Sequence, residues 1–147
     1  MTLPAIALLF LRVQPQGLGL ALWTFVVVWS TDIGAYFAGR GIGGPKLSPA
    51  ISPNKTWAGL GGGVVAALLA GYGLATALSL PGPLLWLGAP MAVLAQMGDL
   101  FESWLKRRAG VKDSGRILPG HGGMLDRLDG LVPVAVAVAS LLMLGLL

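Results

Sequence analysis

Apolar residues in this chain fall into long runs that are broken by two polar stretches and one short uncharged turn. A helix needs roughly 20 apolar residues to cross about 30 Å of hydrocarbon. Four runs come near that length, at residues 17–38, 57–79, 84–101 and 130–147. The pattern predicts an all-α, polytopic helical membrane protein in which polar loops connect the membrane-crossing segments.

A shorter apolar run covers residues 3–12 and ends at Arg12. It lacks the small-residue cleavage pattern of a secretory signal. We interpret it as a fifth helix or as the tail of a longer one, so we expect four to five transmembrane helices. Residues 1–147 are predicted to form a single membrane-embedded domain that lacks N-terminal helices of a longer protein.

The composition supports this class and limits the chemistry. Hydrophobic residues make up 55% of the chain and charged residues 11%, whereas soluble proteins carry about 25% charged residues. Most of the glycines lie inside apolar runs, where small residues let helices approach closely. With no cysteine and one histidine, disulfides, thiolate metal sites and histidine-rich zinc sites are excluded. A metal ion would therefore need carboxylate ligands.

Basic residues gather in the connections 39–56 and 102–129, whereas the turn 80–83 carries no charge. The positive-inside rule places both basic connections in the cytoplasm. The formal charge is +4, but its cations flank apolar spans, which favours contact with anionic lipid or phosphate over nucleic acid. We therefore expect a multi-pass protein of the inner (cytoplasmic) membrane with a polar site on the cytoplasmic face.

The stretch from Ser103 to Asp129 holds six of the ten basic residues and three of the six acidic ones. Within it, Asp126 and Asp129 are three residues apart, so on a helix their side chains would share a face. Close carboxylates together with substrate phosphate oxygens are typical of a magnesium site. The alternative is an ordinary helix start, where the macrodipole favours acidic residues.

Two further aspartates lie in or beside apolar runs, where ionisable groups are costly and usually functional. Asp99 follows the apolar run that ends near Met97 and is a candidate third metal ligand, with an ion pair to Lys106 as the alternative. Asp32 lies inside an apolar run. A hydrogen-bonded structural brace and a substrate contact explain Asp32 equally well.

Residues 52–57 are predicted to start a helix. Ser52 would cap it and Pro53 would take the first helical position. Lys55 and Thr56 would then lie in the first turn, where free backbone amides can bind a phosphate. Ordinary capping without a ligand is the alternative for Ser52 and Pro53.

Glycines on both sides of His121 allow a tight turn and a close approach to a ligand. Such a histidine can contact phosphate or transfer a proton near neutral pH, or it can bond locally within the turn. The charged residues before it would complement phosphates, although cations that snorkel at a lipid surface are an alternative. These residues are Lys106, Arg107, Lys112 and Asp113.

The same stretch carries a long and highly specific motif. It reads Ser, two residues, Lys-Arg, four residues, Lys-Asp, then Pro-Gly-His-Gly-Gly, two residues, Asp-Arg, one residue, Asp. The motif is matched by Ser103, Lys106, Arg107, Lys112, Asp113, Pro119 to Gly123, Asp126, Arg127 and Asp129. In this motif, and in upstream elements from about residue 17, the chain resembles the phosphatidate cytidylyltransferase (CDP-diacylglycerol synthase) family.

The resemblance implies transfer of a cytidylyl group from CTP to phosphatidate, which yields CDP-diacylglycerol and pyrophosphate for phospholipid biosynthesis. It implies a site for Mg²⁺, with K⁺ as a further candidate ion, held by Asp99, Asp126 and Asp129, and a catalytic role beside them for His121. The implied substrate-binding residues are Ser52, Lys55, Thr56, Ser103, Lys106, Arg107, Lys112, Asp113 and Arg127. The expected partners are CTP, phosphatidate and the lipid bilayer, and a homodimer is left open.

The chain departs from the family pattern in two ways. Family members are usually much longer, with additional N-terminal helices, and the position after Trp57, often Glu or Gln, is Ala58. Three alternative functions remain: a cytidylyltransferase for another lipid phosphate such as an archaeal ether lipid, an inactive helical membrane-assembly fragment, and a transporter. A CDP-alcohol phosphotransferase is disfavoured, because its Asp-Gly, two residues, Ala-Arg element is absent from the sequence.

Overall fold

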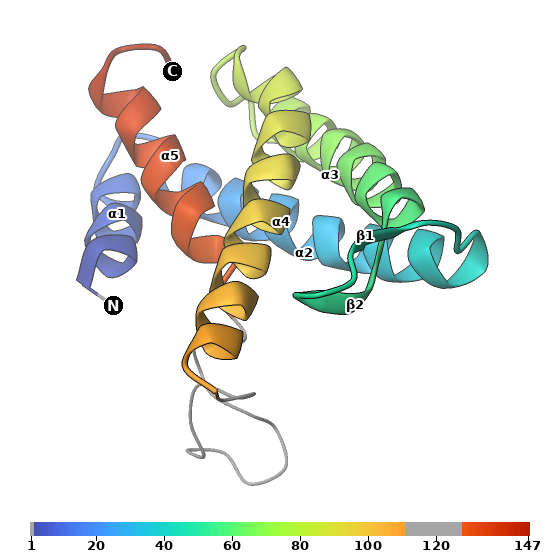
Figure 1. Ribbon diagram of the computed structural model, residues 1–147. Helices are drawn as coiled ribbons and strands as arrows, with labels where there is room; N and C mark the ends of the chain where they lie inside the picture. Colours follow the sequence, from blue (N-terminus) through green and yellow to red (C-terminus); the bar gives the residue numbers. More distant parts are fainter. Residues whose placement is uncertain (1, 111–127) are drawn as a thin grey trace, which may run out of the picture.

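The computed structural model describes residues 2–110 and 128–147, which form five helices and one short β-hairpin (Figure 1). In chain order the elements are α1 (Thr2–Arg12), α2 (Gly17–Gly41), β1 (Lys46–Ser48), β2 (Ser52–Thr56), α3 (Trp57–Ala77), α4 (Leu84–Arg108) and α5 (Leu131–Met143). The helical fold class predicted from the apolar runs is confirmed.

Three helices, α2, α3 and α4, are long and apolar enough to cross a membrane. The helix α4 continues past residue 101 to Arg108, and the three basic residues of its last turn complement the negative end of the helix dipole. The helix α5 is shorter than its apolar run. It ends at Met143, before Gly145, which has a φ of +69°. Its 13 residues span about 20 Å, less than the hydrocarbon thickness.

Glycine lets α2 and α3 pack with their backbones in contact. A Cβ on Gly34 of α2 would lie 2.6 Å from the carbonyl oxygen of Gly62, and a Cβ on Gly62 would overlap that of Ala38. These two helices share the most extensive contact in the described structure. The interpretation of the helical glycines as packing positions is confirmed here.

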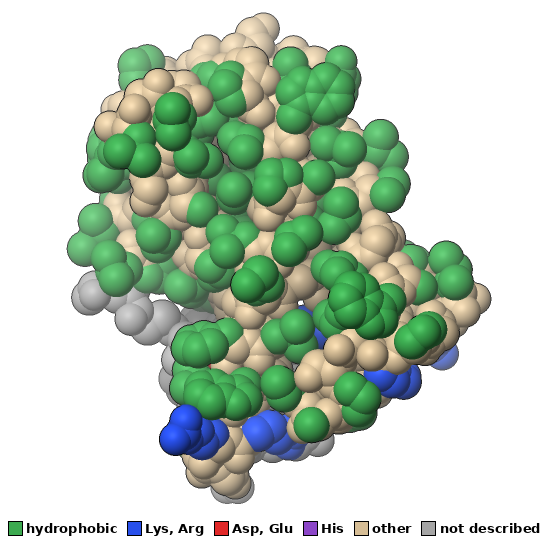
Figure 2. Space-filling view, turned by 45° about the horizontal axis from the view of Figure 1, so that its top comes forward, with side chains coloured by type: hydrophobic (Ala, Val, Ile, Leu, Met, Phe, Trp, Pro, Cys, Tyr) green, Lys and Arg blue, Asp and Glu red, His purple; other side chains and the backbone are tan. Residues whose placement is uncertain are grey.

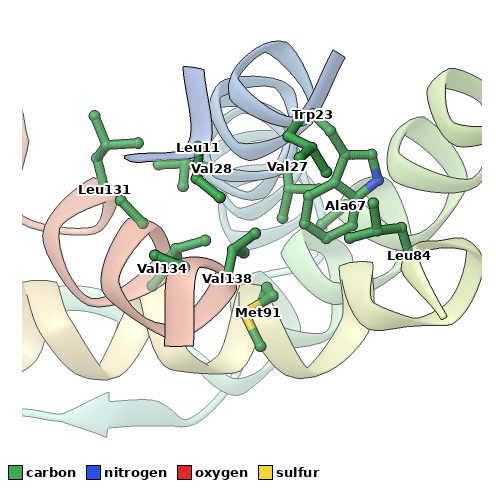
Figure 3. Close-up of a cluster of buried hydrophobic side chains, with 14 of the residues drawn as sticks. Leu11, Trp23, Val27, Val28, Ala67, Leu84, Met91, Leu131, Val134 and Val138 are labelled. Atoms are coloured by element: carbon green, nitrogen blue, oxygen red, sulfur yellow. The ribbon is translucent and has the colours of Figure 1, made fainter. Parts of the chain in front are cut away.

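The buried core lies where α2 meets α4 and α5 (Figure 3). Trp23 of α2 is fully buried, and its indole Nε1 donates a hydrogen bond of 3.0 Å to the carbonyl oxygen of Gly71 on α3. Val27, Ala67 and Leu84 lie around it from three different helices. The polar atom of the largest core side chain is thereby satisfied without water.

The outer surface also carries large apolar side chains. Leu69 and Trp86 are 68% and 67% exposed. Figure 2 shows apolar side chains over most of the visible face, with Lys and Arg side chains gathered along one edge. The charge segregation predicted from the sequence therefore exists in three dimensions.

The hairpin β1–β2 replaces the helix start that was predicted at Ser52 and Pro53. In the antiparallel pair, Ser48 lies opposite Ser52 and Lys46 lies opposite Thr56. The helix α3 begins only at Trp57, and its N-cap is Thr56, whose hydroxyl oxygen accepts a 3.0 Å hydrogen bond from the amide of Gly59. The prediction for Ser52 and Pro53 is wrong, because pairing with β1 holds this segment extended and Thr56 supplies the cap.

The hairpin packs beside the C-terminal half of α4, away from the turn that joins α3 to α4 (Figure 1). That turn lies close to the end of α1, since Leu80 and Arg12 line the same depression of about 300 Å³. The hairpin and the C-terminal half of α4 thus lie together, and Arg12 lies beside the turn that joins α3 to α4. In this arrangement a side chain of the hairpin can reach Asp99 on α4.

Candidate active site

Four elements, α2, β2, α3 and α4, enclose a polar cavity of about 190 Å³. The residues that line it come from three separate parts of the sequence, because β2 and α3 follow one another directly. The lining residues are Asp32, Ala35, Tyr36, Asn54, Lys55, Thr56, Gly59, Leu60, Gln96 and Asp99. Two carboxylates, one ammonium and two amide side chains face a space large enough for a small charged group.

An ion pair between Lys55 of β2 and Asp99 of α4 crosses this cavity. The Lys55 side chain is 18% exposed, and among the described residues its buried ammonium has no hydrogen-bonding partner beside this ion pair. The alternative that paired Asp99 with Lys106 is wrong, because Lys106 lies 3.3 Å from Glu102, one turn along the same helix. An ammonium carries three donors, so Lys55 retains the capacity to bind an anion in the cavity.

The position of Lys55 follows from its neighbours in the chain. Thr56 is buried and caps α3, and it lies opposite Lys46 in the hairpin. A Cβ on Gly39 would lie 3.1 Å from the Thr56 hydroxyl, so α2 passes close to this cap. Three elements therefore hold the backbone of Lys55 in place, and its long side chain spans the remaining distance to α4.

Asp99 also contacts groups on the side away from Lys55. The hydroxyl of Ser103, one turn later on α4, donates a weak 3.4 Å hydrogen bond to Oδ1 of Asp99. Asp129, just before α5, interacts with Asp99 both by charge and by a hydrogen bond between their side chains. Asp99 thus joins the cavity to the segment that precedes α5.

The surroundings of Asp129 favour its protonated form. Burial first, and the Asp99 carboxylate second, raise the pKa of Asp129 to about 7, although Oδ1 accepts a 2.6 Å hydrogen bond from the amide of Gly130. The backbones come close here, since a Cβ on Gly98 would lie 2.9 Å from the carbonyl oxygen of Asp129. Two adjacent carboxyl groups repel when both are ionised, so they either share a proton or bind a cation.

A second, mostly apolar groove of about 400 Å³ lies between α4 and α5. Its apolar walls include Phe101, Leu105 and Pro133, and its charged members are Glu102, Lys106 and Asp129. Asp129 therefore borders this groove while its carboxyl group contacts Asp99 of the polar cavity. An apolar surface and a charged site adjoin at this residue.

The structure brings together five of the predicted site residues: Lys55, Thr56, Asp99, Ser103 and Asp129. Lys106 lines the neighbouring groove. Ser52 lies at the start of β2 and Arg107 is exposed near the end of α4, and neither is in the described lining of the cavity. The remaining predicted residues, which are Lys112, Asp113, His121, Asp126 and Arg127, lie outside the described residues.

The predicted metal ligands are partly described. Asp99 and Asp129 are adjacent, but no group of three or more Asp, Glu, His or Cys side chains forms a metal site within residues 2–110 and 128–147. The third predicted ligand, Asp126, is not among these residues. The magnesium site therefore stays a prediction.

Sequence reasoning missed several lining residues of the cavity. Asp32 was left between two roles, and Tyr36, Asn54 and Gln96 were not selected. Gln96 carried a usable signal, because it is a buried polar residue in an apolar helix, three positions before Asp99. Asn54 carried no such signal, since a polar residue in a loop is ordinary.

The apolar helices and the charged cavity define an all-α membrane protein with a site that combines two carboxylates and a lysine. Residues 1–144 match the model of the cytidylyltransferase family, and the chain belongs to this family. It is 54% identical over 127 residues to the phosphatidate cytidylyltransferase of Brucella suis, an alignment that covers 83% of this chain and 46% of that protein.

Two more distant organisms have similar proteins of the same name. The phosphatidate cytidylyltransferase of Bacillus subtilis is 50% identical over 121 residues, covering 80% of this chain and 45% of that protein. For Haemophilus influenzae the identity is 43% over 124 residues, covering 79% of this chain and 43% of that protein. The chain thus spans somewhat less than half the length of these relatives.

Proposed function

We propose that the chain carries the catalytic site of a phosphatidate cytidylyltransferase, which transfers a cytidylyl group from CTP to phosphatidate. One observation supports this most directly. A lysine ammonium with spare donors and a pair of adjacent carboxyl groups meet at Asp99. Transfer of a cytidylyl group to a lipid phosphate uses both kinds of group, cations for the phosphates and carboxylates for a metal ion.

In this proposal Lys55 binds a phosphate group in the cavity. Its ammonium is buried, faces a polar space and has donors to spare. Asn54 and Gln96 line the same space and can donate hydrogen bonds from their amide groups. Lys106, in the adjoining groove, is the proposed contact for the headgroup phosphate of the lipid.

The described residues fit a divalent cation by the chemistry of their donors. Asp99 and Asp129 provide adjacent carboxyl oxygens whose mutual repulsion a cation would remove. Mg²⁺ is the proposed ion, K⁺ a further candidate, and Asp126 the expected third ligand. When bound, such an ion would neutralise charge on the phosphates of CTP.

The reaction is a single substitution at phosphorus. An oxygen of the phosphatidate phosphate attacks the α-phosphorus of CTP, a new P–O bond forms, and the bond to the β-phosphate breaks. Pyrophosphate leaves with the electron pair of that bond. The chain's own side chains hold the two substrates: Lys55 positions phosphate in the cavity, and the apolar groove beside Asp129 accommodates acyl chains.

The setting we propose is the inner membrane, with the site on its cytoplasmic face. The meeting of the hairpin residue Lys55 with Asp99 of α4, away from the turn that joins α3 to α4, supports a site at one membrane surface. A lipid bilayer supplies the lipid substrate laterally to the apolar surface. A homodimer is the proposed assembly to test.

The test is an assay of the purified chain in nanodiscs with labelled CTP, phosphatidate and Mg²⁺. Labelled CDP-diacylglycerol should form, should disappear with a chelator, and should be absent for Asp99→Asn while Ser30→Ala is unaffected. Ser30 is a matched control because its hydroxyl bonds only to carbonyl groups of its own helix, those of Val26 and Val27.

A parallel reaction contains an ether-lipid phosphate in place of phosphatidate. Product with the ether lipid alone would assign a different substrate. Absence of product with both lipids, together with absence of Mg²⁺-dependent CTP binding, would overturn the proposal.

A further inference from the structure

Lys55 contacts Oδ2 of Asp99, the carboxylate that is proposed to bind a cation together with Asp129. The ammonium is in contact with the Asp99 carboxylate, and two cations cannot both sit against one carboxylate oxygen without strong repulsion. If Asp99 binds a divalent ion, as the proposed function requires, that ion and the Lys55 ammonium repel each other across one carboxylate group, which favours a move of Lys55 away from Asp99. The displaced ammonium then needs another anionic partner, because an unpaired charge in this cavity is costly.

Asp32 of α2 offers that partner. It lines the same cavity as Lys55 and Asp99, and its charge interacts with both of them. It is inside a helix long and apolar enough to cross a membrane, where an isolated carboxylate is unfavourable. Gly34, two residues later, packs closely against Gly62 of α3, and Gly39 of the same helix approaches Thr56 of the hairpin.

We propose that Asp32 is a positioning residue, which receives the ammonium of Lys55 when Asp99 takes up a divalent cation. The inference rests on the proposed metal site and adds a role for a residue that the sequence left undecided. Lys55 then passes from one carboxylate to the other without leaving the cavity. It stays available to phosphate, and cation binding at Asp99 does not leave it unpaired.

Two electrostatic consequences distinguish this arrangement from a purely structural aspartate. Because Lys55 competes with the cation for Asp99, removing its charge should tighten cation binding. Removing Asp32 should weaken cation binding, since the ammonium loses its alternative partner and stays on Asp99. The second effect acts through Lys55, so it should largely vanish in a chain that lacks Lys55.

The experiment measures Mn²⁺ binding to the purified chain in nanodiscs by electron paramagnetic resonance, without nucleotide. We expect Lys55→Met to bind Mn²⁺ about tenfold more tightly and Asp32→Asn about tenfold more weakly, the range usually measured for coupled charged neighbours. In the double variant, the loss due to Asp32→Asn should shrink to about twofold or less. Asp32→Glu, which keeps the charge, should bind close to the unsubstituted chain.

Each alternative outcome contradicts a different step. If the unsubstituted chain binds no Mn²⁺, the proposed metal site and this inference both fail. If the chain binds Mn²⁺ but Asp32→Asn binds equally well, the inference alone fails. If Asp32→Asn weakens Mn²⁺ binding as much in the chain with Lys55→Met as in the chain with Lys55, Asp32 acts directly on the ion and the positioning role is overturned.

A loss of fold is detected separately by thermal unfolding of each variant. Ser30→Ala on the same helix is the control, and its Mn²⁺ affinity should be unchanged. If Asp32→Asn does not fold, Asp32→Glu and Lys55→Met still decide the question. Weaker Mn²⁺ binding by Lys55→Met would overturn the proposed competition at Asp99.

Discussion

Lys55, in the strand before α3, forms an ion pair with Asp99, in the C-terminal half of α4, so a polar connection of the chain meets an aspartate that lies in an apolar run. The pair ties the hairpin to α4 and closes one side of the polar cavity. It also places the basic group proposed for phosphate next to the acidic group proposed for metal. Four predictions start from this arrangement and from the packing that maintains it.

Lys55→Ala should lower kcat/KM for CTP by about 10- to 100-fold, the usual loss when a hydrogen bond to a charged group is removed. The matched control is Arg108→Ala, which removes an exposed cation at the end of α4 that stacks on Trp104. Steady-state kinetics in nanodiscs measures both variants. Equal kinetics for Lys55→Ala and the control would confine Lys55 to a structural role.

Asp129 should make stability depend on pH. Its pKa rises on folding from 3.8 to about 7, so between these values the folded chain binds more protons than the unfolded chain. The free energy of unfolding should therefore fall as pH rises through this window and level off above it. Thermal unfolding at several pH values, with a chelator present, measures the slope.

The comparison for this prediction is Asp129→Asn, in which the contribution of this carboxyl group is absent. The difference in stability between the two chains should change between pH 5 and pH 7 and stay constant above about pH 7. A constant difference over the whole range would show that Asp129 does not titrate in this way.

Gly62→Ala should destabilise the protein by about 1–3 kcal/mol, because the added methyl group overpacks the contact between α2 and α3. Its neighbour Gly61 is an ideal control, since a Cβ there meets nothing within 4 Å. Gly61→Ala should be neutral or stabilise the helix by up to about 1 kcal/mol. Unfolding in denaturant measures both, and equal stabilities would disprove the tight helix contact.

Leu105→Trp should narrow the apolar groove between α4 and α5 and raise KM for phosphatidate about three- to tenfold, with KM for CTP unchanged. Leu69→Trp on the outward face of α3, where Leu69 is 68% exposed, is the control. The lipid concentration in mixed micelles is varied at fixed CTP. If Leu105→Trp changes KM for CTP as well as KM for phosphatidate, the groove does not act as a site for acyl chains alone.

Helices and charged ends could be predicted from the sequence for a simple reason. Twenty apolar residues in a row can satisfy their backbone in hydrocarbon only as a helix, so α2, α3 and α4 follow from run length. The hairpin did not follow, because Ser52 and Pro53 are equally good helix-start residues and only pairing with Ser48 selects the extended form. The preference of these two residues for a helix start is weaker than the pairing of their strand with β1.

The sequence by itself determined the class of protein and which residue types carry its chemistry, because apolar run length and the spacing of charged groups are local properties. Only the tertiary structure decided which of those charges meet. Asp99 pairs with Lys55 rather than with Lys106, and Asp32 shares their cavity. The contact forms because close packing at glycine brings α2 and α3 together and sets the hairpin beside α4, a geometry that no spacing within one segment contains.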